Sequence, residues 1–248
     1  MGDVNPQSAI RNRMSETYTQ RMRVAFATDD TVKYVGHLDM ARAWERAIRR
    51  AGLPLAYSQG FNPQPRLHFA AALPVGFTGQ AELADVFLNE IMAPEEFLAR
   101  LQAAMPSGIR LTRAEPVGRE LPALQAAVVS AAYRVEVETA EPEETFAARL
   151  EAFLARTEAV RVRRRGQEEA SYDLRPLVLA LAHVGSCDLG QAFDVTMRAE
   201  AGATGRPDEL LAELGFEMTP RRIARTGLGL ASADAERLFG VTLSGLVP

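Results

Sequence analysis

Apolar residues alternate with other residues in several short stretches, and each stretch predicts a β-strand. Met22, Val24 and Phe26 follow this two-residue period within residues 21–28, as in a strand with one buried face. Further strands are expected at residues 66–73, 81–88, 108–117, 131–140, 159–165, 172–184, 191–200 and 221–230. The turn-rich sequence PVGFTG, residues 74–79, is expected to join two of these strands as a hairpin.

Four other stretches repeat their apolar residues every three to four positions and predict amphipathic helices. In residues 37–51, Leu38, Trp44 and Ile48 recur near this spacing, and Gly52 marks the end of the helix. Further helices are expected at residues 94–105, 141–157 and 206–215. Each of these three has a proline in its first turn followed by acidic residues, a pattern that favours a helix N-terminus.

The order strand, helix, strand, strand, helix, strand occurs over residues 21–118, and residues 131–228 repeat it in a degenerate form. It is the split βαβ pattern of a ferredoxin-like unit. We therefore predict an α+β fold with two such units in tandem, the second degenerate, each with helices on one face of a mainly antiparallel sheet. The expected organisation is a flexible tail over residues 1–20, a first unit over 21–118, a linker over 119–130 and a second α+β unit over 131–248.

Composition favours a folded protein without a membrane role. Of 248 residues, 47% are hydrophobic and 24% charged, which is typical of globular domains. No stretch approaches the roughly 18 apolar residues of a membrane span, and the polar N-terminus lacks the apolar core of a signal peptide. The single cysteine, Cys187, agrees with a reducing compartment. We therefore expect a cytoplasmic protein.

Charge is unevenly distributed along the chain. A net charge of −4 argues against a protein that coats nucleic acid indiscriminately, because such binding needs a positive field. Arginines nevertheless cluster within residues 42–66 and again within 161–165. Arginine suits bidentate recognition of phosphate or carboxylate. Local anion-binding surfaces are therefore compatible with the acidic average.

Several kinds of catalytic centre are excluded by the residues present. Radical SAM chemistry needs three thiolates around an iron–sulfur cluster, so a chain with one cysteine is not itself a radical SAM enzyme. His37, His68, His183 and Cys187 are too dispersed for metal-ligand spacing. Phosphate-binding glycine motifs are missing as well. We expect no cofactor and no metal, and whether the chain is an enzyme stays open.

The most informative segment is LPLAYSQGFNPQPR, residues 53–66, in which prolines and a glycine exclude a regular helix. A rigid loop of this kind exposes backbone N–H groups to an anion, and its aromatic rings could stack on bases. The expected substrate or anion site combines this loop with the preceding helix: Arg42, Arg46, Arg49, Tyr57, Ser58, Gly60, Phe61, Asn62 and Arg66. In the alternative interpretation, the aromatic rings pack into the core and the arginines are merely solvated.

Four further polar residues are secondary candidates. His37 and Asp39 begin the first helix, where His37 could transfer a proton to a ligand; the simpler interpretation is that Asp39 complements the helix dipole. Asp173 and Arg175 share one face of a predicted strand. They either face a ligand or form an ion pair that fixes the strand, and the ion pair is the simpler account.

Residues 33–76, which include GHLD, the arginine-bearing helix and the SQGFNPQPR loop, resemble the radical SAM-linked proteins, and YDLRPLV, residues 172–178, is a second matching point. Members of this bacterial family of unknown function occur alone or joined to a radical SAM protein with a cobalamin-binding-type domain. The resemblance implies a radical SAM protein as partner. Gln64 stands where the family pattern leads us to expect histidine, which argues against an essential imidazole there.

Three functions compete on this basis. The first is an accessory protein that binds an RNA or ribonucleoprotein substrate and presents it to a radical SAM enzyme. The second is a small-molecule enzyme with a pocket between the two units, using polar groups such as His37, Asp39, Arg66 and Asp173. The third is a purely protein-binding module. An exposed apolar patch would favour the third, and a closed polar pocket the second.

Overall fold

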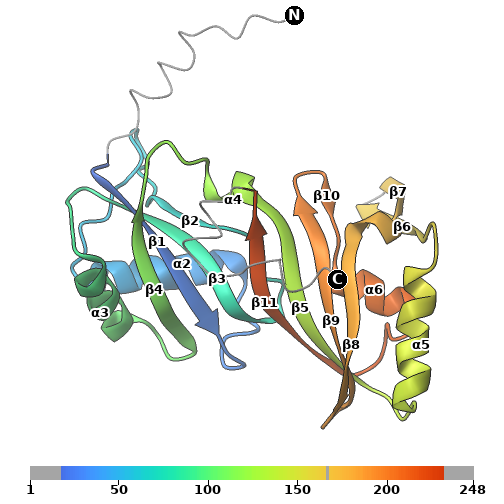
Figure 1. The fold of residues 1–248 in the computed structure, drawn as a ribbon. Helices are drawn as coiled ribbons and strands as arrows, with labels where there is room; N and C mark the ends of the chain where they lie inside the picture. The colour runs from blue at the N-terminus through green and yellow to red at the C-terminus, as the bar shows by residue number, and fades with distance from the viewer. Residues whose placement is uncertain (1–17, 166–167, 232–248) are drawn as a thin grey trace, which may run out of the picture.

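The computed structural model describes residues 18–165 and 168–231, and Figure 1 shows a large sheet with helices packed against it. The strands are β1 (Gln20–Thr28), β2 (Leu67–Phe69), β3 (Thr78–Leu88), β4 (Ile109–Val117), β5 (Val128–Glu138), β6 (Val160–Arg165), β7 (Glu168–Asp173), β8 (Val178–Cys187), β9 (Gly190–Glu200), β10 (Ala203–Thr204) and β11 (Arg221–Leu230). The helices are α2 (His37–Arg50), α3 (Pro94–Ala104), α4 (Leu124–Ala127), α5 (Glu143–Leu154) and α6 (Pro207–Glu213). The predicted α+β class is confirmed.

The first half of the sheet has the strand order β4-β1-β3-β2, and every neighbouring pair is antiparallel. Met22 and Val24, which alternate in the sequence, lie on the face of β1 that the helices cover. Trp44 and Ile48 of α2 and Phe97 of α3 are fully buried against this face. Periodicity in the sequence therefore identifies both the strand and the side of the sheet on which the helices lie.

The second half repeats this connection order. Its strands follow as β11-β5-β9-β8, again antiparallel throughout, and the short β10 pairs with the end of β9. Phe146 and Leu150 of α5 and Leu210 of α6 pack with Phe193 and Val195 of β9 in one buried cluster. The strands β6 and β7 form a separate two-stranded sheet.

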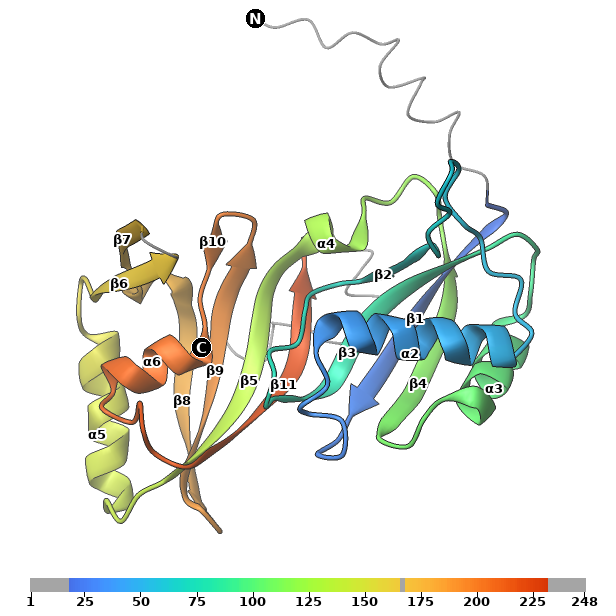
Figure 2. The same ribbon diagram turned by 180° about the vertical axis from the view of Figure 1, so that it is seen from behind.

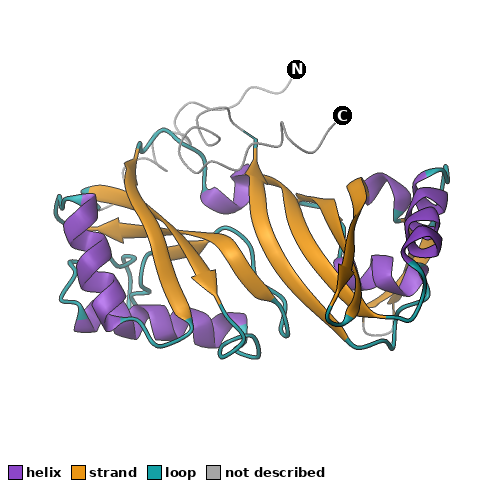
Figure 3. Cartoon of the chain, turned by 60° about the horizontal axis from the view of Figure 1, so that its bottom comes forward, coloured by secondary structure: helices purple, strands orange, loops and turns teal. Residues whose placement is uncertain are grey.

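One continuous sheet joins the two halves. β11 runs parallel to β3 over two residue pairs, Ala224 with Thr78 and Arg225 with Gly79. Further along, the same edge of β3 pairs with β2. Helices α2 and α6 lie behind this sheet in Figure 1 and in front of it in Figure 2, and Figure 3 shows the strands crossing the whole molecule. The division into two domains at residues 119–130 stays a prediction.

Two predicted strands are interrupted or shortened in the structure. Residues 172–184 are interrupted, because Pro176 lacks an N–H for a strand ladder and lies in a 3₁₀ turn, Arg175–Leu177, between β7 and β8. The strand predicted at 66–73 ends at Phe69. Beyond it, the backbone oxygens of residues 71–72 accept hydrogen bonds from an arginine side chain instead of a strand neighbour.

Some predicted segments lie outside the described residues, and one does not coincide with the observed elements. Residues 1–17 of the expected tail and residues 232–248 of the second expected unit lie outside the described part of the chain. The expected linker 119–130 contains the short helix α4 and the start of β5. Within the described ranges, no helix has the length and apolar character needed to cross a membrane.

Candidate functional site

The loop that follows α2 has a fixed base. Tyr57 and Pro65 form an isolated bridge across the loop. Inside this bridge, the Ser58 N–H donates to the Gln64 backbone oxygen at 2.8 Å, and the Gln64 N–H donates to Ser58 Oγ at 2.9 Å. Residues 58–64 are therefore closed by three contacts at their base, and we call them the tip loop.

The tip loop presents an aromatic ring to solvent. Phe61 has an exposed fraction of 112%, so the interpretation that it packs into the core is wrong. Gly60 before it has a φ of +128°, in the region that favours glycine. Asn62 is also exposed, and its backbone oxygen accepts from Gln64 Nε2 at 3.3 Å. A ring held in this way can stack on a base without prior refolding of the loop.

Arg49 connects α2 to the base of the tip loop. Its Nε donates to Tyr57 Oη at 3.3 Å, and its Nη2 donates to Glu45 Oε1. The hydrogen bonds to Tyr57 and then to Glu45 raise the pKa of the Arg49 guanidinium. The Tyr57 ring is partly buried against the core beneath α2. Tyr57 therefore supports the loop, and of the two rings predicted to stack on bases, Phe61 is the one that is exposed.

The two other predicted arginines of α2 share the helix face of Arg49, because they lie seven and three residues before it. Arg42 Nη1 is 3.1 Å from Asp39 Oδ1, and both side chains are about two-thirds exposed. Arg46 is exposed, and no described carboxylate forms an ion pair with it. Within the described residues, Arg46 is thus the member of this set whose charge is left for a ligand.

Arg66 lies on the opposite face of the sheet. Its guanidinium carbon is 5.6 Å from the ring centroid of Tyr18 and 5.9 Å from that of Phe87. Phe87 alternates along β3 with Leu88, which belongs to the core beneath α2. The prediction that Arg66 joins the helix arginines is therefore wrong. Leu67 packs into that core, so its neighbour Arg66 must point the other way.

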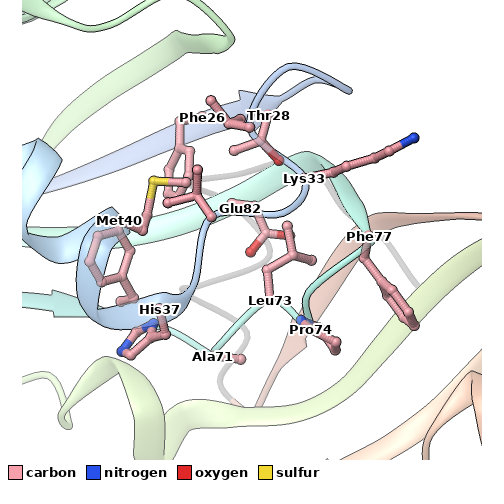
Figure 4. A pocket seen from close by; sticks show the side chains of 13 residues that line it. Phe26, Thr28, Lys33, His37, Met40, Ala71, Leu73, Pro74, Phe77 and Glu82 are labelled. Carbon is pink, nitrogen blue, oxygen red and sulfur yellow. The ribbon is translucent and has the colours of Figure 1, made fainter.

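His37 and Asp39 lie at the end of α2 that is remote from the tip loop. Arg49 is the twelfth residue after His37 along the helix, which corresponds to about 18 Å. The His37 ring contacts Phe69 edge-on at 5.5 Å and lines a cavity of about 30 Å³, enough for about two water molecules. Figure 4 shows His37 and Met40 on one side of this cavity and Phe77 on the other. A substrate would not fit there.

Asp173 and Arg175 bind backbone groups rather than each other. Asp173 Oδ1 accepts from the N–H groups of Ala159 at 2.8 Å and Arg175 at 3.0 Å. The Arg175 guanidinium donates to the Leu154 oxygen at the end of α5 and to the Val178 oxygen. The expected ion pair is therefore wrong. Both side chains instead fix the turn between β7 and β8, which is a structural role.

The second basic cluster is partly neutralised inside the protein. Arg161 of β6 pairs with Glu213 of α6 at 3.1 Å, and Arg163 pairs with Glu209 at 2.7 Å. Acidic residues of α6 therefore face the strand that the sequence marks as basic. This pairing attaches the β6–β7 hairpin to the second half and leaves the two arginines unsuited to bind phosphate.

Sequence reasoning missed a buried ion pair at the junction of the two halves. Arg225 of β11 is 2% exposed and Glu82 of β3 is 3% exposed; they are joined by an Nε–Oε1 bond of 2.7 Å and a second bond from Nη2. Arg225 also donates to the backbone oxygens of Ala71 at 3.0 Å and Ala72 at 3.2 Å, and it bonds Tyr133. In each of the two strands a charged residue interrupts the alternation of apolar residues, and this interruption is the sequence feature that could have indicated a buried pair.

A cleft of about 400 Å³ opens beside this ion pair. Its walls come from both halves: Ala72, Pro74 and Phe77 precede β3, while Tyr133 and Arg206 belong to the second half. The volume lies in the range of small-molecule sites. Of the polar residues expected in a pocket between the units, none lines this cleft.

Comparisons with known proteins relate the chain to a family without an assigned activity. The model of a family described as "Uncharacterized protein conserved in bacteria (DUF2344)" matches residues 21–207. No curated protein matches the chain. Among solved structures, a chain of "Crystal Structure of a Cbf5-Nop10-Gar1 Complex" aligns with a TM-score of 0.46 and 11% identity, over 88% of this chain and 50% of the other. This chain thus spans half the length of that solved chain.

Proposed function

The chain belongs to DUF2344, an uncharacterised family conserved in bacteria, and from this premise we propose that it is an RNA-binding accessory protein of a radical SAM enzyme. In this proposal the tip loop and the arginine face of α2 hold a single-stranded segment of an RNA or ribonucleoprotein. The partner enzyme supplies the chemistry. The proposal is carried by one observation, the fully exposed Phe61 on a loop with a fixed base.

Exposure of Phe61 needs an explanation, because a solvated phenyl ring at a loop tip contributes nothing to the core. Stacking on an unpaired base would bury the ring, and each such contact is worth about 1–3 kcal/mol. The bridge and hydrogen bonds at the loop base reduce the ordering cost of binding. Stacking is tolerant of sequence, since every base has a flat face. The expected ligand is therefore an RNA with an accessible single-stranded segment.

The arginine face of α2 supports this proposal through charge. Arg49 is bonded to Tyr57 at the base of the tip loop, so the helix face and the loop are adjacent. Arg46 and Arg42 are exposed further along the same face. Arg46 offers an unpaired guanidinium to a phosphate backbone that passes beside the stacked base. Arg42 can join it by exchanging its exposed ion pair with Asp39 for a phosphate. Because the protein has a net charge of −4, long-range attraction for RNA is small, and the intrinsic affinity should be weak.

The radical SAM partner is proposed from the resemblance of residues 33–76 and from the single cysteine, which leaves any such chemistry to another protein. A protein contact is also favoured by apolar side chains near the start of α2. Tyr34 and Leu38 are 74% and 71% exposed, and Val75 is 60% exposed. The Gly76 N–H donates to the Lys33 oxygen, which brings the two segments together. Exposed apolar residues grouped in this way mark contact sites.

The test measures binding of a labelled single-stranded RNA of about 15 nucleotides, a length near the upper site size of single-strand binders, by fluorescence anisotropy across a salt series. Phe61→Ala should weaken binding about fivefold or more without changing the salt slope. Arg42→Ala combined with Arg46→Ala should lower the slope by about 0.7 for each phosphate that is no longer neutralised by an arginine. Binding should tighten when the co-purified radical SAM protein is added.

Two control variants remove an apolar side chain and an arginine at exposed positions outside the tip loop and α2. Ile91→Ala deletes an exposed apolar side chain, and Arg222→Ala deletes an exposed arginine of β11. Both should leave RNA binding unchanged. If wild-type protein retains no RNA at low salt, alone or with the partner, the proposal fails. It also fails if the controls weaken binding as much as the tip-loop and α2 variants do.

A further inference from the structure

The cleft between the two halves has walls of ordered backbone. The strands β11 and β3 meet over only two residue pairs, and the ion pair of Arg225 with Glu82 lies at that point. Arg225 also holds the backbone of residues 71–72 through their oxygens. This fixes one side of the cleft, while the connection from β10 to α6 lies on the other. The space of about 400 Å³ between them is within the range of small-molecule sites.

Most side chains that line the cleft are apolar. Pro74 and Phe77 offer the larger apolar surfaces, and the Phe77 ring meets the Tyr133 ring edge-on with 6.2 Å between their centroids. Four alanines add smaller apolar surfaces: Ala71, Ala72, Ala131 and Ala199. A fully polar molecule would lose hydration here without gaining hydrogen bonds in return. The cleft therefore suits a ligand with an apolar body.

The charged side chains of the cleft leave one positive charge without a partner. Arg225 is neutralised by Glu82. Asp208 is paired with Arg221, with its Oδ1 3.2 Å from Nη2. Arg206 also lines the cleft and is exposed, and no carboxylate of the described residues forms an ion pair with it. With both other charges compensated, the cleft favours a ligand that carries a single negative charge.

A carboxylate fits this charge better than a phosphate does. A guanidinium binds a carboxylate through two parallel N–H···O bonds, so one carboxylate balances Arg206. A phosphate monoester carries nearly two negative charges at neutral pH, and the second would meet Asp208 with no cation of the cleft left to balance it. Tyr133 adds a neutral donor, because its hydroxyl accepts from Arg225 and keeps its own hydrogen.

We propose that this cleft binds a small carboxylate with an apolar body, its carboxylate paired with Arg206 and its body against Pro74 and Phe77. The inference goes beyond the proposed RNA binding and does not depend on it. Of the described residues that line the cleft, none belongs to the tip loop or to α2. An aryl carboxylate such as naphthoate has the chemistry of this ligand class and serves as the probe.

The experiment compares four probes by ligand-observed NMR titration of the purified full-length protein. Naphthoate carries the charge and the apolar body, naphthamide the body alone, and acetate the charge alone; naphthyl phosphate replaces the carboxylate. Naphthoate should bind about fivefold more tightly than naphthamide, as expected for one partly exposed ion pair. Acetate should not bind measurably, because it leaves the apolar walls uncovered. Naphthyl phosphate should bind no more tightly than naphthoate.

Variants locate the binding in the cleft. Arg206→Gln should lower naphthoate affinity about fivefold and leave naphthamide unchanged. Ala72→Phe places a ring on a wall of the cleft and should weaken both probes at least about tenfold. As controls, Arg222→Gln removes another exposed arginine of β11, and Ala103→Phe adds the same ring to exposed α3. Both controls should bind like wild type. Thermal unfolding confirms that each variant is folded, and Arg206→Gln, a surface change, keeps the test decisive if Ala72→Phe is not.

Several results would overturn the inference. Equal affinity for naphthoate and naphthamide would mean that Arg206 recognises no charge, and tighter binding of naphthyl phosphate would make the cleft a phosphate site. Unchanged binding by folded Ala72→Phe would place the probes elsewhere. Failure of naphthoate to bind at millimolar concentration overturns the inference as well. Saturating naphthoate should leave RNA binding unchanged, so either proposal can fail without the other.

Discussion

Replacing Arg225 by methionine tests how the two halves are held together. Methionine has a similar length and no charge, so the change leaves Glu82, 3% exposed, without its cation. Breaking a buried pair by removing one partner typically costs about 3–5 kcal/mol. Arg225 also donates to the oxygens of Ala71 and Ala72, and removing each of these bonds adds about 1 kcal/mol. We expect a loss of about 5–7 kcal/mol, a large part of the roughly 5–15 kcal/mol that stabilises a typical domain.

Urea unfolding followed by circular dichroism measures this loss, and a double-mutant cycle assigns it. Glu82→Met alone should also destabilise the protein, because it leaves the buried Arg225 unpaired. The double variant, with both residues replaced by methionine, should be less destabilised than Arg225→Met, since no buried charge is then left alone. The reasoning is refuted if the two single losses add up in the double variant, or if Arg225→Met costs less than about 1 kcal/mol.

Two further predictions concern pH. Burial raises the pKa of the Tyr133 phenol, against the lowering effect of Arg225, so stability should fall as pH rises above the unfolded value of 10.0, and Tyr133→Phe should flatten that fall in alkaline urea titrations. Burial alone would raise the pKa of Glu213, but hydrogen bonds and charge from Arg156 and Arg161 outweigh it and lower the pKa below 4.5. The stability that Glu213 contributes should therefore be present above that pH and be lost as the pH falls through the lowered folded value, so Glu213→Gln should destabilise the protein more at about pH 7 than at about pH 3.

Much of the local structure follows from periodicity, because the residues that decide it are close together in the chain. The strand β1 and the helix α2 lie within one residue of their predicted bounds. Their apolar residues, such as Met22 and Trp44, face one core. The interruption at Pro176 also had a local cause, a proline within an otherwise apolar stretch, and the prediction extended the strand through it.

The candidate site was only partly predictable. The contact between Arg49 and Tyr57 spans eight residues, and the helix and loop signals were enough to place them together. Either Arg66 or its neighbour Leu67 can point into the core, and the pairing of β2 with β3 determines that Leu67 does. The ion pair of Arg225 with Glu82 joins residues 143 positions apart. No local pattern predicts which strands meet at that distance.

One edge of β3 pairs with both β2 and β11, and this pairing determines how the protein would behave if its chain were cut. Were the polypeptide cut between β4 and α4, each fragment would expose backbone N–H and C=O groups along the strand that now meets the other half. Such bare edges are templates for pairing with any available strand. When produced together, the two fragments should recombine along this edge, since Ala224 and Arg225 find their partners at Thr78 and Gly79. When produced separately, each should tend to aggregate.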